Sequence, residues 1–269
     1  MKEDVADDTP ELMHFHNVRK HNIARMAADE NLKTLARRLM IDVSPVQYSY
    51  QFDWLGRPII QIPQDIVAYQ EVVWAVKPDL IIETGIAHGG SLILSASLLA
   101  LLEVCDAATA GTTLDPGSPN RRVVGIDIEI RNHNRALIEA HPLSWRVEMI
   151  EGSSVTDDVV HRVRSIARDY QRILVCLDSN HTHAHVLQEL EAYASLVTPG
   201  SYCIVWDTVI EDSPEGIFPD RPWGPGNNPK TAVHEFLSSH PEFTIDATIP
   251  DKLLITVAPD GYLKRLSLP

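Results

Sequence analysis

The stretch Val76–Glu103, VKPDLIIETGIAHGGSLILSASLLALLE, decides the fold. A short apolar run ends in an acid, Glu83, and a turn containing Gly85, Gly89 and Gly90 follows at once. The apolar segment after the turn is long enough to form a helix. A buried strand that passes through a tight turn into a helix is typical of an open parallel sheet, in which ligands bind at the carboxyl ends of the strands.

The rest of the chain repeats this alternation of apolar runs and helical segments. Near-continuous apolar strands joined by helices predict a doubly wound, mostly parallel α/β sheet with seven strands. The predicted strands are 80–83, 123–127, 146–150, 173–178, 202–207, 243–248 and 252–257, the last two forming an antiparallel hairpin through TIPD. The predicted helices are 90–102, 132–140, 155–170, 185–196 and 229–239.

Two segments stand apart from this alternation. Helical patterning over 10–41 predicts an N-terminal helical extension, residues 1–50, ahead of one α/β domain, residues 51–269. The segment DSPEGIFPDRPWGPGNNPK, residues 212–230, is rich in proline and glycine. A loop of this length inside a compact domain is typical of a lid over a working site.

The composition excludes several classes of partner. A net charge of −14 argues against binding to nucleic acid or to an anionic membrane surface. The sequence contains no run of 18 uninterrupted apolar residues, so no membrane span is predicted. The acidic start MKEDVADDTPELM does not resemble a secretory signal. Cys176 and Cys203 lie inside apolar runs and are interpreted as reduced core residues, which indicates a cytoplasmic protein.

The glycine-rich turn differs from a dinucleotide fingerprint. It reads Glu83-x-Gly85-x-x-x-Gly89-Gly90-Ser91, and an acid ahead of the glycines would repel a pyrophosphate. A cofactor with a cationic amino group and no phosphates suits the turn, and S-adenosyl-L-methionine (SAM) fits that description. The predicted contacts of this cofactor in the turn are Glu83, Gly85, Ala87, His88, Gly89 and Ser91.

The next two strand ends extend the same predicted crevice. Asp127, at the end of the second strand, is expected to accept hydrogen bonds from two ribose hydroxyls, and Gly152 and Ser153 are expected to lie against the adenine edge. A helix-capping acid or an ordinary turn explains each feature singly. Their order along an alternating α/β chain favours the cofactor.

Two acids end the fourth and fifth predicted strands, Asp178 and Asp207. Adjacent parallel strands lie about 4.8 Å apart, so both carboxylates can converge on one hard cation. Mg²⁺ takes a few carboxylate oxygens and keeps waters, which leaves positions for a substrate diol. His181 follows Asp178 by three residues, and a neutral imidazole there would remove a proton from a hydroxyl nucleophile.

The sequence HTHAH places His181, His183 and His185 at alternate positions. A zinc site would need a further nitrogen or sulfur ligand, and no cysteine is nearby in the sequence. A facial triad for non-haem iron is formally available from Asp178, His181 and His185. For His183 a capping or surface role is the default interpretation.

Together, the segments PDLIIETGIAHGGSL, GIDIEIR, CLDSNHTHAHV, ELEAYASLVTPGSY and DTVIED…FPDRPWGPGNNPKTAVHEFL resemble the cephalosporin hydroxylase / rhamnosyl O-methyltransferase family over about residues 50–258. The resemblance implies the class I SAM-dependent methyltransferase fold, Rossmann-like, and Mg²⁺-assisted O-methylation of a hydroxyl on a sugar or an antibiotic precursor. It also suggests a homo-oligomer. Carried over, Asp178 and Asp207 become metal ligands and His181 the base, with Asp178 also counted as a catalytic residue and a cofactor contact.

The chain departs from related macrolide-sugar methyltransferases at Trp206, where those enzymes have the first acid of a doublet. This leaves the metal one carboxylate short, unless Glu211 or Asp212 compensates from beyond the strand end. Three alternatives therefore stay open: a non-catalytic partner subunit with the same fold, an iron-dependent hydroxylase, and a nicotinamide oxidoreductase. The acceptor is also open among sugar, polyketide, β-lactam and lipid-linked glycan.

Overall fold

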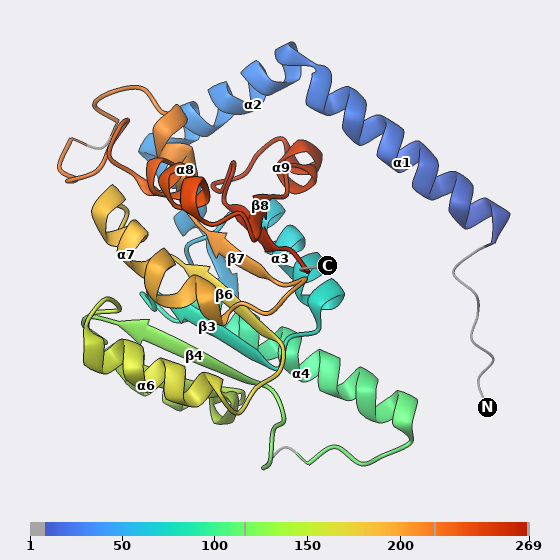
Figure 1. The fold of residues 1–269 in the computed structure, drawn as a ribbon, viewed down its shortest axis with the longest axis vertical. Coiled ribbons are helices and arrows are strands. Elements are labelled where there is room, and N and C mark those ends of the chain that lie inside the picture. The colour runs from blue at the N-terminus through green and yellow to red at the C-terminus, as the bar shows by residue number, and fades with distance from the viewer. Residues whose placement is uncertain (1–8, 116, 218, 268–269) are drawn as a thin grey trace.

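The centre of the molecule is a seven-stranded sheet with the order β5-β4-β3-β6-β7-β9-β8 (Figure 1). The computed structural model describes residues 9–115, 117–217 and 219–267. The strands are β3 (Leu80–Thr84), β4 (Arg122–Asp127), β5 (Val147–Glu151), β6 (Ile173–Leu177), β7 (Tyr202–Val205), β8 (Phe243–Ile245) and β9 (Tyr262–Arg265). Strands β3 to β7 pair in parallel, whereas β9 runs antiparallel to both β7 and β8. The predicted doubly wound, mostly parallel sheet is confirmed.

Helices cover both faces of the sheet because successive strand side chains point to opposite sides. Ile81 packs with α3 (Pro63–Val76) and α4 (Gly90–Ala110) on one face, and Leu80 and Ile82 pack on the other face. That second face is covered by helices α6 (Asp157–Ala167), α7 (His183–Tyr193) and α8 (Pro229–Ser239). The short helix α5 (Asn132–Glu139) lies between β4 and β5 in the chain.

Helix α4 begins directly at the glycine-rich turn and is longer than predicted. It ends at Ala110, where Gly111 takes a left-handed conformation (φ 66°) and closes the helix. Among the residues that the structure describes, α4 alone is long and apolar enough to cross a membrane. Because more than half of its most apolar window is buried inside the fold, α4 is accounted for as a core helix.

The predicted antiparallel pair at one edge of the sheet is confirmed, with β8 inside 243–248, but the predicted second strand, 252–257, and the direct turn between the two strands are wrong. The segment TIPD belongs to a short helix, α9 (Thr248–Leu253), and the second strand is β9, which inserts between β7 and β8. The Asp246 carboxylate accepts hydrogen bonds from the amide and hydroxyl of Thr248, which favours a helix start at this point. The mostly apolar segment 253–257 has the composition of a strand, but the segment that pairs with β7 is β9.

The N-terminal part of the chain forms two helices and a hairpin. Helices α1 (Pro10–Ala28) and α2 (Glu30–Val43) meet at Asp29, whose carboxylate accepts from the amides of Asn31 and Leu32 and so caps α2. A two-stranded hairpin, β1 (Phe52–Trp54) and β2 (Arg57–Ile59), connects them to α3. Residues 1–8 of the predicted extension and Phe218 of the predicted lid lie outside the described residues.

Candidate functional site

A cavity of about 1110 Å³ lies at the carboxyl ends of β3, β6 and β7. The glycine-rich turn, Asp178, His181 and Asp207 all contribute to its lining. Further walls come from α2, from the segment 209–223 and from α9. Cavities that hold a drug-sized ligand measure roughly 300–1,000 Å³, so this space is large enough for a cofactor and an acceptor together.

Gly85 brings the turn against the end of β6. Its φ is 89°, and a Cβ added there would lie 2.1 Å from the carbonyl oxygen of Asp178. No other residue type fits this approach without moving one of the two segments. The close packing therefore places Asp178 beside the turn, as the order of the strands predicted.

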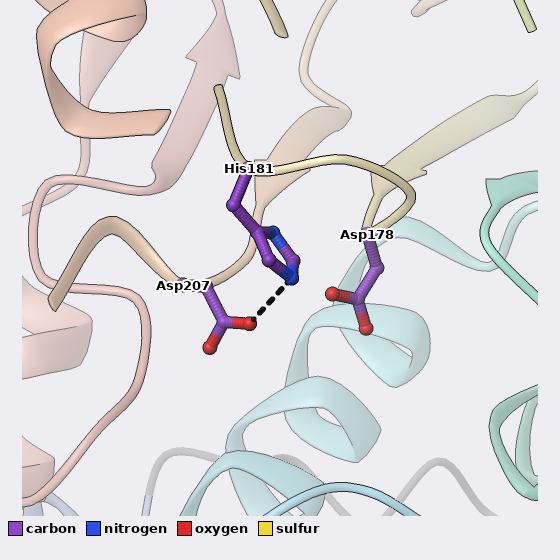
Figure 2. Close-up of side chains that lie close together, drawn as sticks. All are labelled: Asp178, His181 and Asp207. Atoms are coloured by element: carbon purple, nitrogen blue, oxygen red, sulfur yellow. Dashed lines mark ion pairs between the residues drawn. The ribbon is translucent and has the colours of Figure 1, made fainter. Parts of the chain in front are cut away.

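Asp178, His181 and Asp207 form a group whose possible ligand atoms all lie within 4.8 Å of one another (Figure 2). The Nε2 atom of His181 is 3.2 Å from an Oδ atom of Asp207. Asp207 has a left-handed backbone (φ 56°) in the turn after β7, an uncommon conformation that aspartate tolerates better than most residues. The structure thus brings together the three side chains that sequence reasoning assigned to the chemistry.

The electrostatics of this group suit a cation. Desolvation raises the pKa of Asp178 well above its usual range, and the nearby Asp207 carboxylate raises it further. Two carboxylates that share one partly buried place are stabilised either by a proton or by a positive ion. Carboxylate oxygens are the ligands that Mg²⁺ prefers, so the residues present fit a magnesium ion.

Trp206 does not face this group. Its indole is buried and packs edge-on against Tyr69 and Tyr262, with ring centroids 6.4 and 6.0 Å away. The expected compensation by Glu211 or Asp212 is not found either. Glu211 accepts from the Gly226 amide at 2.7 Å and from the Asn228 side chain, and Asp212 pairs with Lys230 at 2.9 Å.

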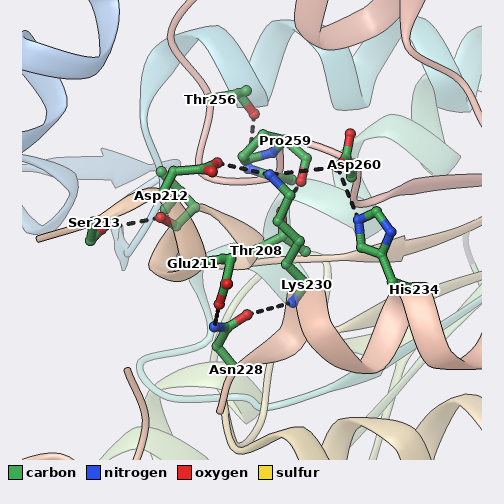
Figure 3. A network of polar contacts seen from close by, with 12 residues as sticks. Thr208, Glu211, Asp212, Ser213, Asn228, Lys230, His234, Thr256, Pro259 and Asp260 are labelled. Atoms are coloured by element: carbon green, nitrogen blue, oxygen red, sulfur yellow. Dashed lines mark hydrogen bonds and ion pairs between the residues drawn. The ribbon is translucent and has the colours of Figure 1, made fainter. Parts of the chain in front are cut away.

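These same two acids hold the C-terminal end of the segment 212–230, since Glu211 accepts from Asn228 and Asp212 accepts from Lys230 (Figure 3). The Lys230 ammonium lies 2.9 Å from Asp212 and 3.5 Å from Asp260, which joins α8 to the loops on either side of the cavity. Within this segment, the Trp223 ring meets the His181 ring edge-to-face at 4.8 Å. The guanidinium group of Arg221 lies 5.1 Å from the same indole. The predicted lid is therefore held in contact with His181.

The other two histidines serve different contacts. His185 Nε2 lies 3.2 Å from Ser154 Oγ and 3.1 Å from Ser179 Oγ, and it does not belong to the group of three. The facial triad with His185 is therefore not formed. His183 contacts the Thr231 hydroxyl at 2.8 Å and Glu235 at 3.1 Å, so it joins α7 to α8 rather than capping its own helix.

The residues predicted for the cofactor fall into two sets. The cavity lining includes Gly85, Ala87, His88, Ser91 and Asp178; it does not include Glu83, Gly89, Asp127, Gly152 and Ser153. Glu83 is buried beneath α4 and accepts a hydrogen bond from Ser91, and burial raises its pKa to about 7. Asp127 accepts from the amides of Ile86 and Ala87 at 2.8 and 3.3 Å.

Sequence reasoning missed part of the cavity wall. Ala36, Arg37 and Met40 of α2 line the cavity, although the pattern placed them in an extension apart from the site. The amphipathic spacing of α2 is the one signal that indicates a packed face, and it does not say against what the face packs.

Comparisons with known proteins identify the family of the chain. A family model described as "Rhamnosyl O-methyltransferase/CmcI" matches residues 46–266. Rhamnosyl O-methyltransferase of Mycobacterium tuberculosis is 28% identical over 203 residues, 75% of this chain and 73% of the relative. The Mycobacterium leprae protein of the same name is 26% identical over 214 residues, 79% of this chain and 82% of the relative.

Solved structures give the same fold. A structure of CmcI with Mg and SAM superposes with a TM-score of 0.52 and 16% identity, covering 81% of this chain and 78% of that one. CmcI with SAH superposes with a TM-score of 0.52 and 18% identity, covering 80% and 83% of the two chains. The sheet order and the flanking helices are those of the Rossmann-like class I methyltransferases.

Proposed function

The chain belongs to the rhamnosyl O-methyltransferase/CmcI family, and we propose that it is a SAM-dependent, Mg²⁺-assisted O-methyltransferase acting on a hydroxyl of a sugar or a natural-product precursor. One observation carries the proposal: Asp178, His181 and Asp207 converge beside the glycine-rich turn, inside a cavity with room for two ligands. The names of the mycobacterial relatives support a sugar as the acceptor.

The turn and its surroundings suit SAM. Ser91 and the backbone of Gly85–His88 face the cavity, with the start of α4 behind them. Asp127 already accepts from two amides of the turn, but a carboxylate offers about four acceptor sites and can still receive ribose hydroxyls. Bound SAM would supply an electrophilic methyl group on a positively charged sulfur, and the turn that would hold it lies beside Asp178.

Asp178 and Asp207 would hold the magnesium ion, which would supply Lewis acidity toward a substrate hydroxyl. The role of His181 would be to accept the proton of the acceptor hydroxyl at Nε2 as that oxygen takes the methyl group. Asp207, 3.2 Å from the imidazole, stabilises the imidazolium that results. The edge contact with Trp223 limits rotation of the His181 ring.

The alternative of a non-catalytic partner subunit rested on Trp206. Because the Trp206 indole serves the core between Tyr69 and Tyr262, its presence is explained without loss of the site. The hydroxylase alternative rested on the name of the family and on a facial triad that includes His185, which contacts Ser154 and Ser179 instead of the group of three. Neither alternative keeps a specific observation in its favour.

The same proposal includes a cytoplasmic homo-oligomer. Cys176 and Cys203 are buried free thiols, which supports a reducing compartment. Leu32, Leu35 and Leu39 are exposed along one side of α2, and an apolar stripe of this kind supports self-association.

The test is transfer of a labelled methyl group from SAM to a panel of rhamnosides, free sugars and polyketide or β-lactam precursors. We expect label in at least one hydroxyl-bearing acceptor with wild type and its loss in Asp178→Asn. Substituting Asp53, an exposed carboxylate on β1, serves as the matched control (Asp53→Asn) and leaves transfer intact. Absence of SAM-dependent label from the whole panel, together with absence of SAH binding, would contradict the proposal.

A further inference from the structure

Two side chains that sequence reasoning did not single out hold the turn Gly85–Gly89 from outside the cavity. Arg57, on β2, donates through Nε at 3.0 Å and through Nη2 to the carbonyl oxygen of His88. Asn134, on α5, donates to the carbonyl oxygen of Ala87 at 2.9 Å. The two side chains also meet, because Arg57 Nη2 lies 3.3 Å from Asn134 Oδ1.

Arg57 and Asn134 are both buried, so their polar atoms need well-formed hydrogen bonds. Arg57 is 7% exposed and Asn134 is 3% exposed. Among the described residues, Arg57 forms no ion pair with a carboxylate, so its buried charge is balanced only by a carbonyl and an amide oxygen. A buried guanidinium is costly to desolvate unless its donors are well satisfied. The buried Arg57 guanidinium therefore holds the carbonyl oxygen of His88 and the amide oxygen of Asn134 in place.

The turn needs such support on both sides. Ala87 has a left-handed backbone (φ 45°). In a residue with a Cβ atom this conformation is sterically unfavourable, so other contacts have to hold it. The Asp127 carboxylate holds the amides of Ile86 and Ala87, and the Arg57–Asn134 pair holds the carbonyls of the following two peptide units. Donors and acceptors of the turn are thus fixed by three elements before any ligand arrives.

The hairpin that carries Arg57 is itself pressed against the turn. A Cβ added at Gly90 would lie 2.3 Å from the carbonyl oxygen of Pro58, the residue after Arg57. Glycine at the start of α4 therefore lets β2 approach closely enough for the Arg57 side chain to reach His88. The N-terminal hairpin, which lies outside the seven-stranded sheet, acquires a direct structural link to the cavity.

From these contacts we propose that Arg57 and Asn134 are positioning residues for the cofactor. They keep the Ala87 and His88 carbonyls in place, so that the turn has its ligand-receiving shape before binding. A preorganised site binds more tightly because no ordering of the loop opposes association. This inference rests on the proposed function, since SAM is the ligand that the turn would receive.

The test compares SAH binding by titration calorimetry in wild type, Asn134→Ala and Arg57→Lys. Asn134→Ala removes both contacts of the amide, and Arg57→Lys keeps the charge but loses the planar fork. We expect Asn134→Ala to weaken SAH binding about 5- to 30-fold, as one or two lost hydrogen bonds and a loosened loop would do. The KM for SAM should rise by a similar factor, while kcat at saturating SAM changes less than about threefold. Arg57→Lys should fall between Asn134→Ala and wild type.

Arg121→Lys is the matched control. Arg121 is a second buried arginine that donates to backbone carbonyls, those of Lys77 and Pro78, and it also pairs with Asp106, all at the opposite end of β3. The Arg121→Lys substitution should lower the melting temperature and leave the affinity for SAH unchanged.

If Asn134→Ala and Arg57→Lys behave like Arg121→Lys, with lower stability but wild-type affinity for SAH, the positioning role is wrong. If wild type itself fails to bind SAH, the proposed function fails and the inference falls with it. Should Arg57→Lys not fold, Asn134→Ala decides alone, with Asn134→Ser as its milder substitute.

Discussion

The Nε2 atom of His181 lies 3.2 Å from Asp207, and both side chains belong with Asp178 to one compact group at the carboxyl ends of β6 and β7 (Figure 2). The contact joins His181, the candidate base, to Asp207, whose carboxylate is also a candidate ligand for Mg²⁺. Under the proposed function Asp207 would have two roles, as a metal ligand and as the partner that stabilises a protonated imidazole. The first two predictions separate these roles.

Replacing His181 with asparagine should lower turnover about 10²- to 10⁴-fold, because the general base is lost while a side chain of capping type remains. SAH affinity should stay near that of wild type, since the imidazole contacts Asp207 and Trp223 rather than the turn. Steady-state kinetics and calorimetry measure the two quantities. His183→Asn, which changes a histidine that joins α7 to α8, is the control and should keep turnover. Near-normal turnover in His181→Asn would show that another group takes the proton.

Removal of divalent cations with EDTA should lower turnover at least about tenfold, and added Mg²⁺ should restore it. Asp207→Asn should need a higher Mg²⁺ concentration for half-maximal rate, because one anionic ligand becomes a neutral one. Undiminished turnover in EDTA, with Asp178→Asn still inactive, would mean that the two acids act on the acceptor directly.

Asp127→Ala should weaken SAH binding about 5- to 150-fold, equivalent to roughly 1–3 kcal/mol. The variant loses the expected acceptor of the ribose hydroxyls and frees two amides of the turn. Glu129→Gln, an exposed neighbour on the same loop, is the calorimetric control. Equal affinities for Asp127→Ala and wild type would rule out this placement of the cofactor.

The contribution of the buried Asp65 to the free energy of unfolding should fall as the pH rises from about 4 to about 7. Burial raises the pKa of Asp65 to about 7, while the unfolded chain releases the same proton near pH 4. Between these values the folded protein holds a proton that the unfolded chain has lost, so higher pH favours unfolding. Glu83, also raised to about 7, adds to the effect.

Asp65→Asn should therefore flatten the decline of melting temperature between pH 5 and pH 8 by several degrees, since one unit of pKa shift corresponds to about 1.4 kcal/mol. Its absolute melting temperature also changes, because Asp65 accepts from Thr256 and from the Val257 amide. The slope is the readout, measured by circular dichroism. Wild-type slope in Asp65→Asn, as expected for the exposed control Asp53→Asn, would contradict the assignment.

The convergence of Asp178, His181 and Asp207 was predictable because its signals are local. Asp178 and Asp207 each follow an apolar run, and parallel strands bring their ends to one edge whatever the intervening sequence. Gly85 was predictable from the same pattern, and its close approach to Asp178 gives the physical reason for it.

The missed features depend on contacts distant in the sequence. Arg57 and Asn134 bind backbone carbonyls that are 31 and 47 residues away, and a carbonyl acceptor leaves no mark in the sequence. The last strand was misplaced because 253–257 has the local look of a strand, whereas the pairing partner of β9 is β7, near residue 203. Trp206 was interpreted against the acids of related enzymes, although its position faces Tyr69 and Tyr262 in the core.

The most direct test of the central claim is a crystal structure of the protein with SAH and Mn²⁺, recorded with anomalous scattering from the manganese. The account predicts SAH along Gly85–Ser91, with its sulfur directed to the space between Asp178 and His181. It also predicts one anomalous peak within coordinating reach of both Asp178 and Asp207, roughly 2.0–2.3 Å from their oxygens. SAH elsewhere in the molecule, or a manganese peak that touches neither carboxylate, would contradict it.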